Sequence, residues 1–227
     1  MNIKRQNIYS DKNAALAVVL FFIGMLVFTS AAFAIQSADV KNIDTAILSY
    51  LKGSNEDALW LKIFMEDITS LGSSSVIFLV SFIMILYFLL IKRRVAALII
   101  FAASTGGGII NILLKSVFQR ERPIAIESFF KVDSLSFPSG HSTMSVAVYL
   151  SLAAVLAGIY KGKSIRYYFI FVGVFLTIII GYSRVYLSVH YPIDVFAGWA
   201  VGISWASFCW LAAYYLQQKR VIGQEDE

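Results

Sequence analysis

The chain has 227 residues, of which 59% are hydrophobic and only 15% are charged. Soluble globular proteins average about 45 to 50% apolar and about 25% charged residues, so this composition excludes an ordinary soluble domain and indicates a protein embedded in lipid. The single cysteine, Cys209, excludes an intrachain disulfide. In a protein embedded in lipid, the basic residues behind the net charge of +5 first indicate how the chain is oriented in the bilayer, and association with nucleic acid is the secondary interpretation.

Six apolar stretches are long enough to cross a bilayer, because a helix rising about 1.5 Å per residue needs roughly 20 residues to span about 30 Å of hydrocarbon. To within a few residues they cover 14–35, 74–91, 95–114, 142–160, 167–182 and 195–216. The sequence has no long-period repeat and no Gly/Ser-rich linker. We therefore predict an all-α, polytopic membrane protein with six transmembrane helices in one integral-membrane domain, residues 1–227.

The first predicted span could also be a cleavable signal peptide, because basic residues precede it and Ala32-Phe33-Ala34 lies near its end. Its apolar run of about 20 residues is longer than the usual signal core of about 7 to 15 residues. We therefore expect residues 1–34 to be retained as a span. Cleavage is the alternative, and it would leave the orientation of the other spans unchanged.

The segment between the first two spans, residues 36–73, is predicted to carry two short amphipathic helices. Ile43, Ile47, Tyr50 and Leu51 recur at helical spacing, and residues 59–68 form a second candidate. We expect both helices to lie on the membrane surface. Their expected role is that of a connector with an apolar side, in preference to a recognition element.

The distribution of basic residues predicts the orientation of the chain, because cytoplasmic loops carry an excess of Lys and Arg. Basic residues precede the first span, lie within 92–94 and 161–166, and follow the sixth span. The segment 36–73 instead holds three lysines and six acidic residues, a balance of −3. Both termini are therefore expected in the cytoplasm.

Two outer segments depart from this charge pattern. They connect the third span to the fourth and the fifth to the sixth, and they hold five basic residues: Lys115, Arg120, Arg122, Lys131 and Arg184. Ionisable groups at membrane depth are costly and by default indicate function. A single such residue is also typical of a membrane anchor whose charged end reaches the interface. Whether these five basic residues indicate function therefore depends on the other residues of the same two segments.

The accompanying residues are unusual, because all three prolines and both histidines of the chain lie in the same two segments. We treat residues 115–194 as a catalytic motif region. Its three motifs are Lys115-x6-Arg122-Pro123, Pro138-Ser139-Gly140-His141 and Ser183-Arg184-x5-His190-x3-Asp194.

The first feature of these motifs is a predicted anion site. Lys115, Arg122 and Arg184 can converge on one polyanion, because Arg presents a planar fork to phosphate oxygens and Lys adds a point charge. Ser139 and Gly140 stand before the fourth span, where free backbone N–H groups and the positive end of the helix dipole favour an anion. Ser139 is a candidate N-cap, and Gly140 has no side chain to block a phosphate.

The second feature is a candidate nucleophile with its acid. His190 and Asp194 are four residues apart at the predicted start of the sixth span, so a helix beginning there would place them on one face. A carboxylate beside an imidazole holds the ring tautomer and stabilises the imidazolium, while the other nitrogen attacks phosphorus. His141, on a different element, is available as the acid. The set predicts phosphoryl transfer, which needs mainly charge neutralisation and in-line positioning.

The three motifs resemble those of the type-2 phosphatidic acid phosphatase superfamily, also called lipid phosphate phosphatases, without a departure at any named position. The six predicted spans agree with the layout of this family. Within it, the short length and six spans look most like the bacterial phosphatidylglycerophosphate phosphatases.

The resemblance implies that His190 is the nucleophile, that Asp194 orients it, and that His141 protonates the leaving oxygen and then assists water. It further implies that phosphate is bound by Lys115, Arg122, Ser139, Gly140 and Arg184. It implies no metal and no other cofactor. The sequence agrees that a zinc site of the metalloprotease type is not expected, since the chain has only two histidines and no His-Glu-x-x-His motif.

We therefore expect a membrane phosphatase that faces the extracytoplasmic side and acts through a phosphohistidine, with phosphatidylglycerophosphate as the leading substrate and phosphatidylglycerol as the product. The alternatives are undecaprenyl diphosphate as substrate, and transfer of the phosphate to an acceptor other than water. An anion transporter would use the cations for selectivity but would leave both histidines unexplained. The expected partners are the lipid substrate and membrane lipids, with no nucleic acid, and the sequence carries no indication of an oligomeric state.

Two further patterns bear on how the chain meets lipid and packs. The segment 124–137 is rich in apolar residues, including Phe129, Phe130 and Phe137, and we expect it either to border a lateral entry for an acyl or prenyl chain or to pack at the interface. Small residues at 106–108 and at Gly198 and Gly202 are expected to let helices approach one another.

Overall fold

The computed structural model describes residues 11–53, 59–123, 135–160 and 162–218, which contain helices and no strand. The helices are α1 (Asp11–Ala34), α2 (Ala38–Gly53), α3 (Leu59–Ser70), α4 (Ser74–Leu90), α5 (Arg94–Phe118), α6 (Gly140–Ser145), the π-helical turn η1 (Val146–Leu150), α7 (Ser151–Ile159), α8 (Lys163–Tyr186) and α9 (Pro192–Gln218). The predicted all-α class is therefore confirmed for these residues.

The predicted spans correspond to helices of the right length and hydropathy. Five of them, α1, α5, the continuous run Gly140–Ile159, α8 and α9, are each long and apolar enough to cross a membrane. The second predicted span is α4, which reaches the required length only together with α3, and this pair is bent by 47°. Within the described ranges five of the six predicted spans are matched directly, and the sixth is matched only if α3, which was expected on the membrane surface, is counted together with α4.

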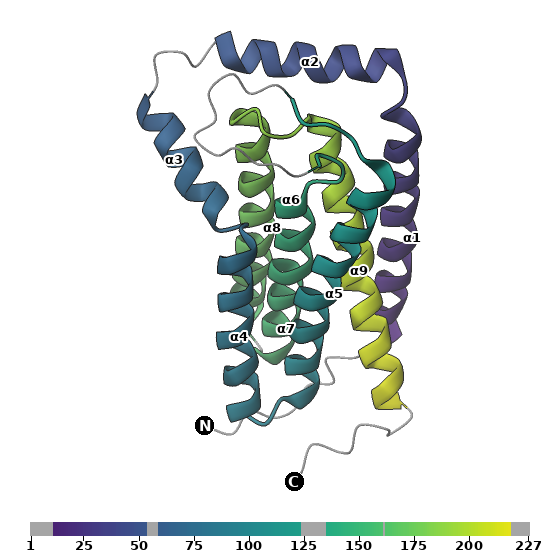
Figure 1. The fold of residues 1–227 in the computed structure, drawn as a ribbon. Coiled ribbons are helices and arrows are strands. Elements are labelled where there is room, and N and C mark those ends of the chain that lie inside the picture. The colour runs from purple at the N-terminus through teal and green to yellow at the C-terminus, as the bar shows by residue number, and fades with distance from the viewer. Residues whose placement is uncertain (1–10, 54–58, 124–134, 161, 219–227) are drawn as a thin grey trace.

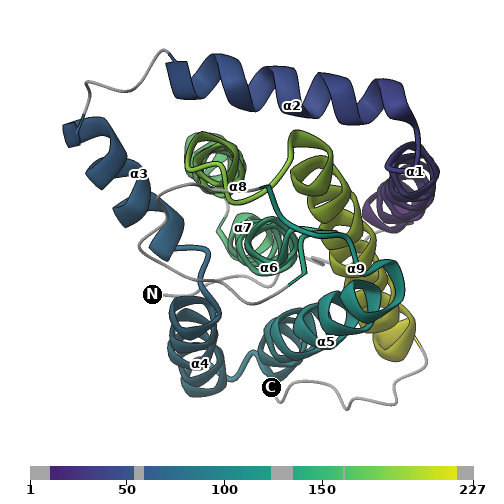
Figure 2. The same cartoon turned by 45° about the horizontal axis from the view of Figure 1, so that its top comes forward.

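The run α6, η1 and α7 forms the centre of the bundle. It contacts α5 and α8 along its length and α9 over α6 and η1, while α4 packs against α5 and α1 packs along the outer side of α9. Figure 1 shows these helices running side by side, and Figure 2, viewed toward one end, shows α6 and α7 surrounded by the others. The central run is largely buried, so it is the element on which the others are positioned.

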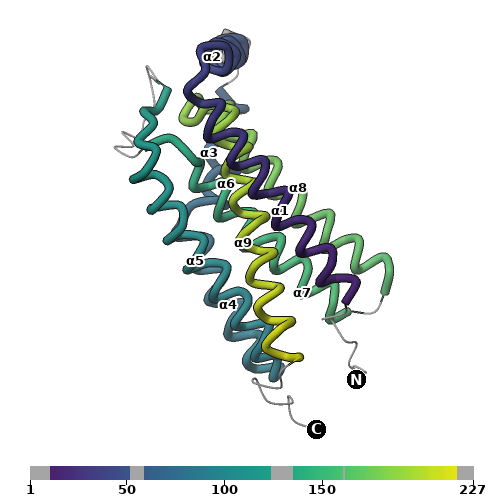
Figure 3. Tube along the Cα trace, turned by 90° about the vertical axis from the view of Figure 1, so that its right-hand side faces the viewer, coloured from purple at the N-terminus to yellow at the C-terminus, as the bar shows by residue number. Residues whose placement is uncertain are grey.

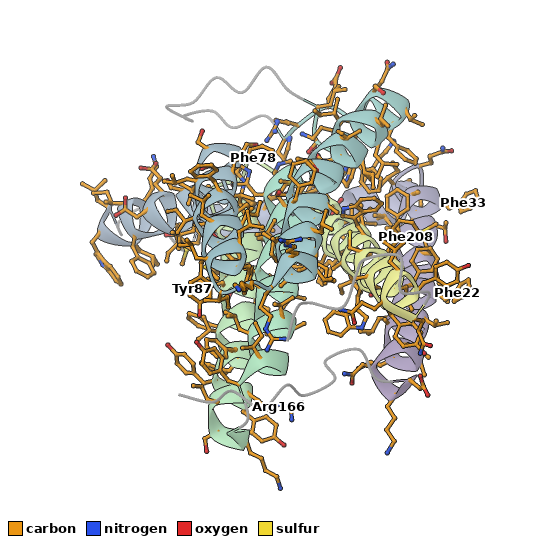
Figure 4. The ribbon with its side chains drawn as sticks, turned by 90° about the horizontal axis from the view of Figure 1, so that it is seen from below. Phe22, Phe33, Phe78, Tyr87, Arg166 and Phe208 are labelled. Carbon is orange, nitrogen blue, oxygen red and sulfur yellow. The ribbon has the colours of Figure 1, made fainter. Side chains whose placement is uncertain are left out.

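The outer surface of the bundle is apolar, and small residues lie where its helices contact one another, as expected for a protein surrounded by lipid. Phe22 and Phe33 are 65% and 82% exposed, and they project from α1 away from the other helices (Figure 4). Gly198 and Gly202 of α9 face α6 and η1 so closely that an added Cβ would lie 2.6 Å from Ser139 O and from Val146 Cβ, respectively. The predicted packing role of these two glycines is confirmed.

Helices α2 and α3 confirm the two short helices predicted between the first spans. α2 crosses one end of the bundle (Figures 1 and 3), with Asp44 and Leu48 buried toward the bundle and Ile43, Ile47 and Tyr50 exposed. Most of the apolar side identified in the sequence is therefore turned outward, whereas Leu51 packs toward the bundle with Leu48. The helix also has a second, inward side that the apolar pattern did not reveal.

The two ends of the bundle differ in what they carry. The beginnings of α6 and α9 and the end of α8 lie at the end crossed by α2, whereas α1 begins and α9 ends at the opposite end (Figure 1). A hydrogen bond of 2.5 Å from Tyr214 Oη to Asp11 Oδ1 joins these last two helix ends. The residues of the three motifs are thus gathered at one end.

Candidate active site

Two of the predicted phosphate-binding cations lie in the last turns of helices. Lys115 is in the last turn of α5 and Arg184 in the last turn of α8, because both helices continue about one turn beyond the apolar stretches. A positive charge is favourable there, since the unpaired carbonyl groups give a helix C-terminus a partial negative charge. The predicted spans stopped about one turn too early because the last turn of each helix contains polar residues and lies at the end of the bundle that holds the site.

Ser139 caps α6 as predicted. Its side-chain oxygen accepts hydrogen bonds from Ser142 N at 3.5 Å and from Ser142 Oγ at 3.1 Å. Gly140 begins the helix, and a Cβ added there would lie 3.0 Å from Asn111 Oδ1. The glycine therefore allows α5 to approach the start of α6, a packing reason that stands beside the room for an anion that we expected.

The chain just before α6 is held by four hydrogen bonds to other elements. Lys115 Nζ donates to Leu135 O at 2.6 Å, and Ser136 N donates to Arg120 O at 2.7 Å. Asn111 Nδ2 donates to Pro138 O at 3.3 Å. The last bond runs from Ser139 N to Asp194 O at 2.9 Å. Residues 135–139 are thereby placed between the end of α5 and the start of α9.

The start of α9 shows why His190 and Asp194 are close. Pro192 is the first residue of the helix, a position where its missing N–H costs nothing. Asp194 Oδ2 accepts a hydrogen bond from Tyr191 N at 3.0 Å, which is one half of a capping box. His190 lies before the helix, and its N–H donates to Arg184 O at 3.3 Å. The predicted proximity is correct, but the capping turn causes it and a shared helix face does not.

His190 and Asp194 are connected by a third residue, Ser136. The distance from His190 Nδ1 to Asp194 Oδ2 is 3.6 Å, whereas Ser136 Oγ lies 2.5 Å from Asp194 Oδ2 and 3.3 Å from His190 Nδ1. The hydroxyl donates to the carboxylate, since an ionised carboxylate only accepts, and so it accepts from the Nδ1–H of the ring. This network assigns the proton to Nδ1 and leaves a lone pair on Nε2.

The lone pair on Nε2 faces a cation. Arg122 Nη1 lies 3.2 Å from His190 Nε2 and donates to Val189 O at 2.8 Å. His190 is 1% exposed. Burial, together with the charges of Arg122, Arg184 and Lys115, holds the pKa of His190 well below its usual range. The ring is therefore neutral at neutral pH, which is the form required of a nucleophile.

Arg184 and His141 border the same region from another side. Arg184 is buried and donates from Nη1 to Thr69 Oγ1 at 2.8 Å, and within the part of the chain that the structure describes its Nε has no hydrogen-bond partner. His141 lies beside the junction of α3 and α4, where a Cβ added to Gly72 would be 3.2 Å from its Cδ2. The charges of Arg184, Arg122 and Lys115 all reach His141. The two histidines and three cations of the motifs are thus brought into one region.

The other oxygen of Asp194 is held by a residue without a predicted role. Arg120 Nη1 donates to Asp194 Oδ1 at 2.6 Å, and Arg120 Nη2 donates to Asp44 Oδ2 at 2.9 Å. In the sequence, Arg120 stands out only as an outer cation and Asp44 only as one negative charge of the segment 36–73. Ser136 belongs to no motif. The position of Ser136, a polar residue two places before Pro138, could have drawn attention to it. Nothing in the local sequence distinguishes Asp44 from the other acidic residues of its segment.

The prediction for the apolar segment 124–137 can be compared with the structure only at its end, where Phe137 is described. Phe137 is fully buried and packs against Phe28 and Phe118, with ring centroids 5.9 and 5.0 Å apart. Its side chain therefore packs inside the bundle, between α1 and α5, and not at the membrane interface as one of the two expectations had it. Phe129 and Phe130 lie outside the described residues. No cluster of three or more His, Cys, Asp or Glu side chains suited to a metal ion occurs among the residues that were described.

Comparison with known proteins gives one family match and a set of relatives. The family model of the PAP2 superfamily matches residues 95–218. Phosphatidylglycerophosphatase B of Bacillus subtilis is 32% identical over 189 residues, which cover 82% of this chain and 89% of the relative. An undecaprenyl-diphosphatase of Sulfolobus acidocaldarius is 38% identical over 78 residues, covering 34% of this chain and 33% of that protein.

Two solved structures share the fold. The crystal structure of the transmembrane PAP2-type phosphatidylglycerolphosphate phosphatase from Bacillus subtilis superposes with a TM-score of 0.74 and 27% identity, covering 92% of this chain and 98% of that one. The crystal structure of Aquifex aeolicus LpxE gives a TM-score of 0.51 and 26% identity, covering 73% of this chain and 93% of that one.

Proposed function

Because this chain belongs to the PAP2 superfamily and is a multi-pass membrane lipid phosphatase of that type, we propose that it removes the terminal phosphate of a lipid phosphate or diphosphate through a phosphohistidine on His190. One observation carries the proposal. The ring of His190 is buried and neutral, its Nδ1 is held by Ser136 and Asp194, and its Nε2 lone pair faces the guanidinium of Arg122.

The first step of the proposed reaction uses the free nitrogen. His190 Nε2 attacks phosphorus, and the new P–N bond forms as the bond from phosphorus to the leaving oxygen breaks. His141 gives its proton to that oxygen. The positive charge that develops on the ring is stabilised through Ser136 by Asp194, while Lys115, Arg122 and Arg184 neutralise the phosphoryl oxygens.

The second step releases the phosphate. His141, now neutral, takes a proton from a water molecule whose oxygen attacks phosphorus. The P–N bond breaks, inorganic phosphate leaves, and His190 returns to its starting form. No metal or other cofactor is required for either step, because the cations of the site supply the charge that phosphoryl transfer needs.

A lipid substrate is consistent with an apolar cavity of about 290 Å³ among α1, α5 and α9, which is partly open to the outside of the bundle. Its lining includes Phe21, Met25 and Phe28 of α1, Ile110 and Leu114 of α5, and Val201 of α9. Leu114 immediately precedes Lys115 in the chain. The cavity therefore offers space for hydrocarbon beside the helix that carries one of the proposed phosphate ligands.

The leading substrate is phosphatidylglycerophosphate, since the Bacillus subtilis phosphatase of that name aligns over most of both chains. Undecaprenyl diphosphate is the alternative, supported by a relative that aligns over a shorter stretch. Turnover of the two lipids by one preparation in native membrane lipid compares them directly. A higher kcat/KM for undecaprenyl diphosphate would replace the leading substrate with the alternative.

We further propose that the termini are cytoplasmic and the site extracytoplasmic. Arg93, Arg94, Lys163 and Arg166 belong to the helix ends opposite the site (Figures 1 and 4), and excess basic residues favour the cytoplasmic side. A substrate synthesised in the inner leaflet would then have to cross the bilayer before hydrolysis.

The proposed intermediate is tested with both histidines. His190→Ala should abolish phosphate release and covalent labelling of the protein. His141→Ala, given a phosphate ester with a good leaving group such as an aryl phosphate, should still form the phosphohistidine and accumulate it, because this leaving group needs little protonation whereas the attacking water loses its base. The measurement is acid-labile phosphate bound to protein after rapid quenching.

Arg166→Gln, a substitution at the opposite end of α8, is the control for expression and detergent extraction and should retain full turnover. Thermal unfolding in detergent verifies that each variant is folded. Turnover by folded His190→Ala protein would contradict the proposed mechanism.

A further inference from the structure

The guanidinium of Arg120 lies between two buried carboxylates. Its Nη1 is 2.6 Å from Asp194 Oδ1 and its Nη2 is 2.9 Å from Asp44 Oδ2. The side chains of Asp44 and Asp194 are only 3% and 0% exposed, and that of Arg120 is 12% exposed. Since a guanidinium is planar and rigid, the two carboxylates are held at a fixed separation by one group.

The remaining contacts of Arg120 keep its plane in place. The Cζ atom lies 4.2 Å from the centroid of the Tyr191 ring, a cation–π contact. Arg120 O also accepts from Ser136 N at 2.7 Å. Arg120 thus contacts Tyr191, the residue after His190, through its side chain, and Ser136, which connects His190 to Asp194, through its backbone carbonyl.

Asp44 makes a second contact at the same place. Its Oδ1 accepts from Ile193 N at 3.3 Å, within the first turn of α9. One carboxylate of α2 therefore binds both the guanidinium that holds Asp194 and the backbone next to Asp194. Burial raises the pKa of Asp44, while the hydrogen bonds from Arg120 and Ile193 oppose that shift.

From this geometry we propose that Asp44 is a positioning residue for the phosphatase reaction, acting through Arg120 on Asp194 and so on His190. The inference rests on the proposed function of His190. Asp44 pairs with Nη2 of the guanidinium, so Asp194 is not the sole counter-ion of Arg120. Asp194 therefore binds Arg120 through Oδ1 alone and keeps Oδ2 available for Ser136. Without the charge on Asp44, Arg120 would draw on Asp194 alone, and the carboxylate would stabilise the developing imidazolium less well.

The test compares Asp44→Asn with Asp39→Asn, an exposed aspartate of the same helix. We expect Asp44→Asn to lower kcat by about 100-fold, the loss typical of a misplaced catalytic group, with KM nearly unchanged because Asp44 does not contact substrate. Asp44→Glu should recover part of the loss, since it restores the charge. Asp39→Asn should have the wild-type kcat.

A double-mutant cycle distinguishes positioning from a general structural role. In an Arg120→Gln background, Asp44→Asn should cost far less than in the wild type, because the group through which it acts is already absent. An equal loss in both backgrounds would overturn the proposal. So would a wild-type kcat for Asp44→Asn, or failure of Asp44→Asn alone to fold while Asp39→Asn folds.

A measurement independent of turnover separates this inference from the proposed function. The chain has two histidines, so ring ¹⁵N NMR of untagged protein in detergent gives two resolvable sets of signals, assigned with His141→Ala. Asp44→Asn should shift the His190 Nδ1 signal, and Asp39→Asn should leave it in place. A wild-type protein without phosphatase activity would contradict the proposed function, whereas an unshifted His190 signal in Asp44→Asn would contradict the role of Asp44.

Discussion

The side chain of His190 meets a different group at each ring nitrogen. Nδ1 faces a hydroxyl that is itself bonded to Asp194, and Nε2 faces Arg122. The first contact favours a proton on the ring and the second disfavours one. Because the ring is also buried, the balance lowers the pKa of His190, and the ring is kept neutral with its free nitrogen on the side of the cations.

The lowered pKa of His190 predicts the acid side of the pH profile. If His190 must be neutral to attack, kcat/KM should fall only below the usual histidine pKa of about 6.5. Arg122→Gln removes a positive charge beside Nε2, so the pKa of His190 rises and the acid limb moves to higher pH, at a lower overall rate. The measurement is kcat/KM between about pH 4 and 8.

Substrate ionisation is the same for all variants, so a shift between them reports the enzyme. Arg166→Gln, which removes a distant charge, should leave the acid limb where it is in the wild type. An acid limb at the same pH in Arg122→Gln and the wild type would show that this limb does not report His190.

At the scale of elements, the site depends on how closely α6 and α9 approach. Gly198 of α9 lies against the backbone of Ser139 and the side chain of Ser142, where an added Cβ would be 2.6 Å from Ser139 O and 2.8 Å from Ser142 Cβ. The same pair of helices is joined by the bond from Ser139 N to Asp194 O. The position of the cap before His141 and the position of Asp194 are therefore set by one helix contact.

Gly198→Ala is predicted to displace both the N-cap residue Ser139 and Asp194. The added methyl meets backbone atoms that cannot rotate away, so α6 and α9 must separate, at a cost of about 1–3 kcal/mol in the free energy of unfolding together with a loss of kcat. Thermal unfolding in detergent and phosphate release measure the two effects. The control is Gly108→Ala in α5, where the nearest atom to an added Cβ is 3.8 Å away.

Gly108→Ala should keep wild-type stability and turnover, since 3.8 Å is an ordinary van der Waals separation. Equal behaviour of the two alanine variants would mean that the approach of α6 to α9 does not limit the site.

At the scale of the whole molecule, the two ends of the bundle carry different charges for different reasons. At the site end, Lys115, Arg122 and Arg184 are within reach of both histidines. At the other end, residues such as Lys163 and Arg166 are exposed at the start of α8. The first group is suited to a bound anion and the second to the positive-inside bias.

Cysteine labelling tests the orientation, because the native Cys209 is only 5% exposed. Ser49→Cys in α2 and Ser164→Cys in α8 place a thiol at exposed positions near opposite ends. A membrane-impermeant maleimide applied to intact spheroplasts should label Ser49→Cys, and it should label Ser164→Cys only after permeabilisation. The wild type is the control for Cys209, and the reverse labelling pattern would contradict the proposed orientation.

Features that depend on the local chain were predictable from the sequence. The helices follow from apolar stretches of bilayer length, Ser139 as a cap from its place before a span, and Pro192 as the first residue of α9 from its missing N–H. The motif residues were recognisable because prolines, histidines and surplus cations, which are unfavourable or rare in an apolar bundle, were concentrated in two segments. In each case the cause lies within a few residues of the effect.

Only the tertiary structure decided which groups act on those residues. Ser136 lies 54 positions from His190, and Arg120 lies 76 positions from Asp44 and 74 from Asp194. No local pattern relates such distant positions; their contacts exist because α2, the end of α5 and the start of α9 pack at one end of the bundle. The sequence by itself determined a bilayer-spanning protein with a phosphate chemistry, and packing determined which side chain faces each ring nitrogen of His190 and which groups hold Asp194 in place.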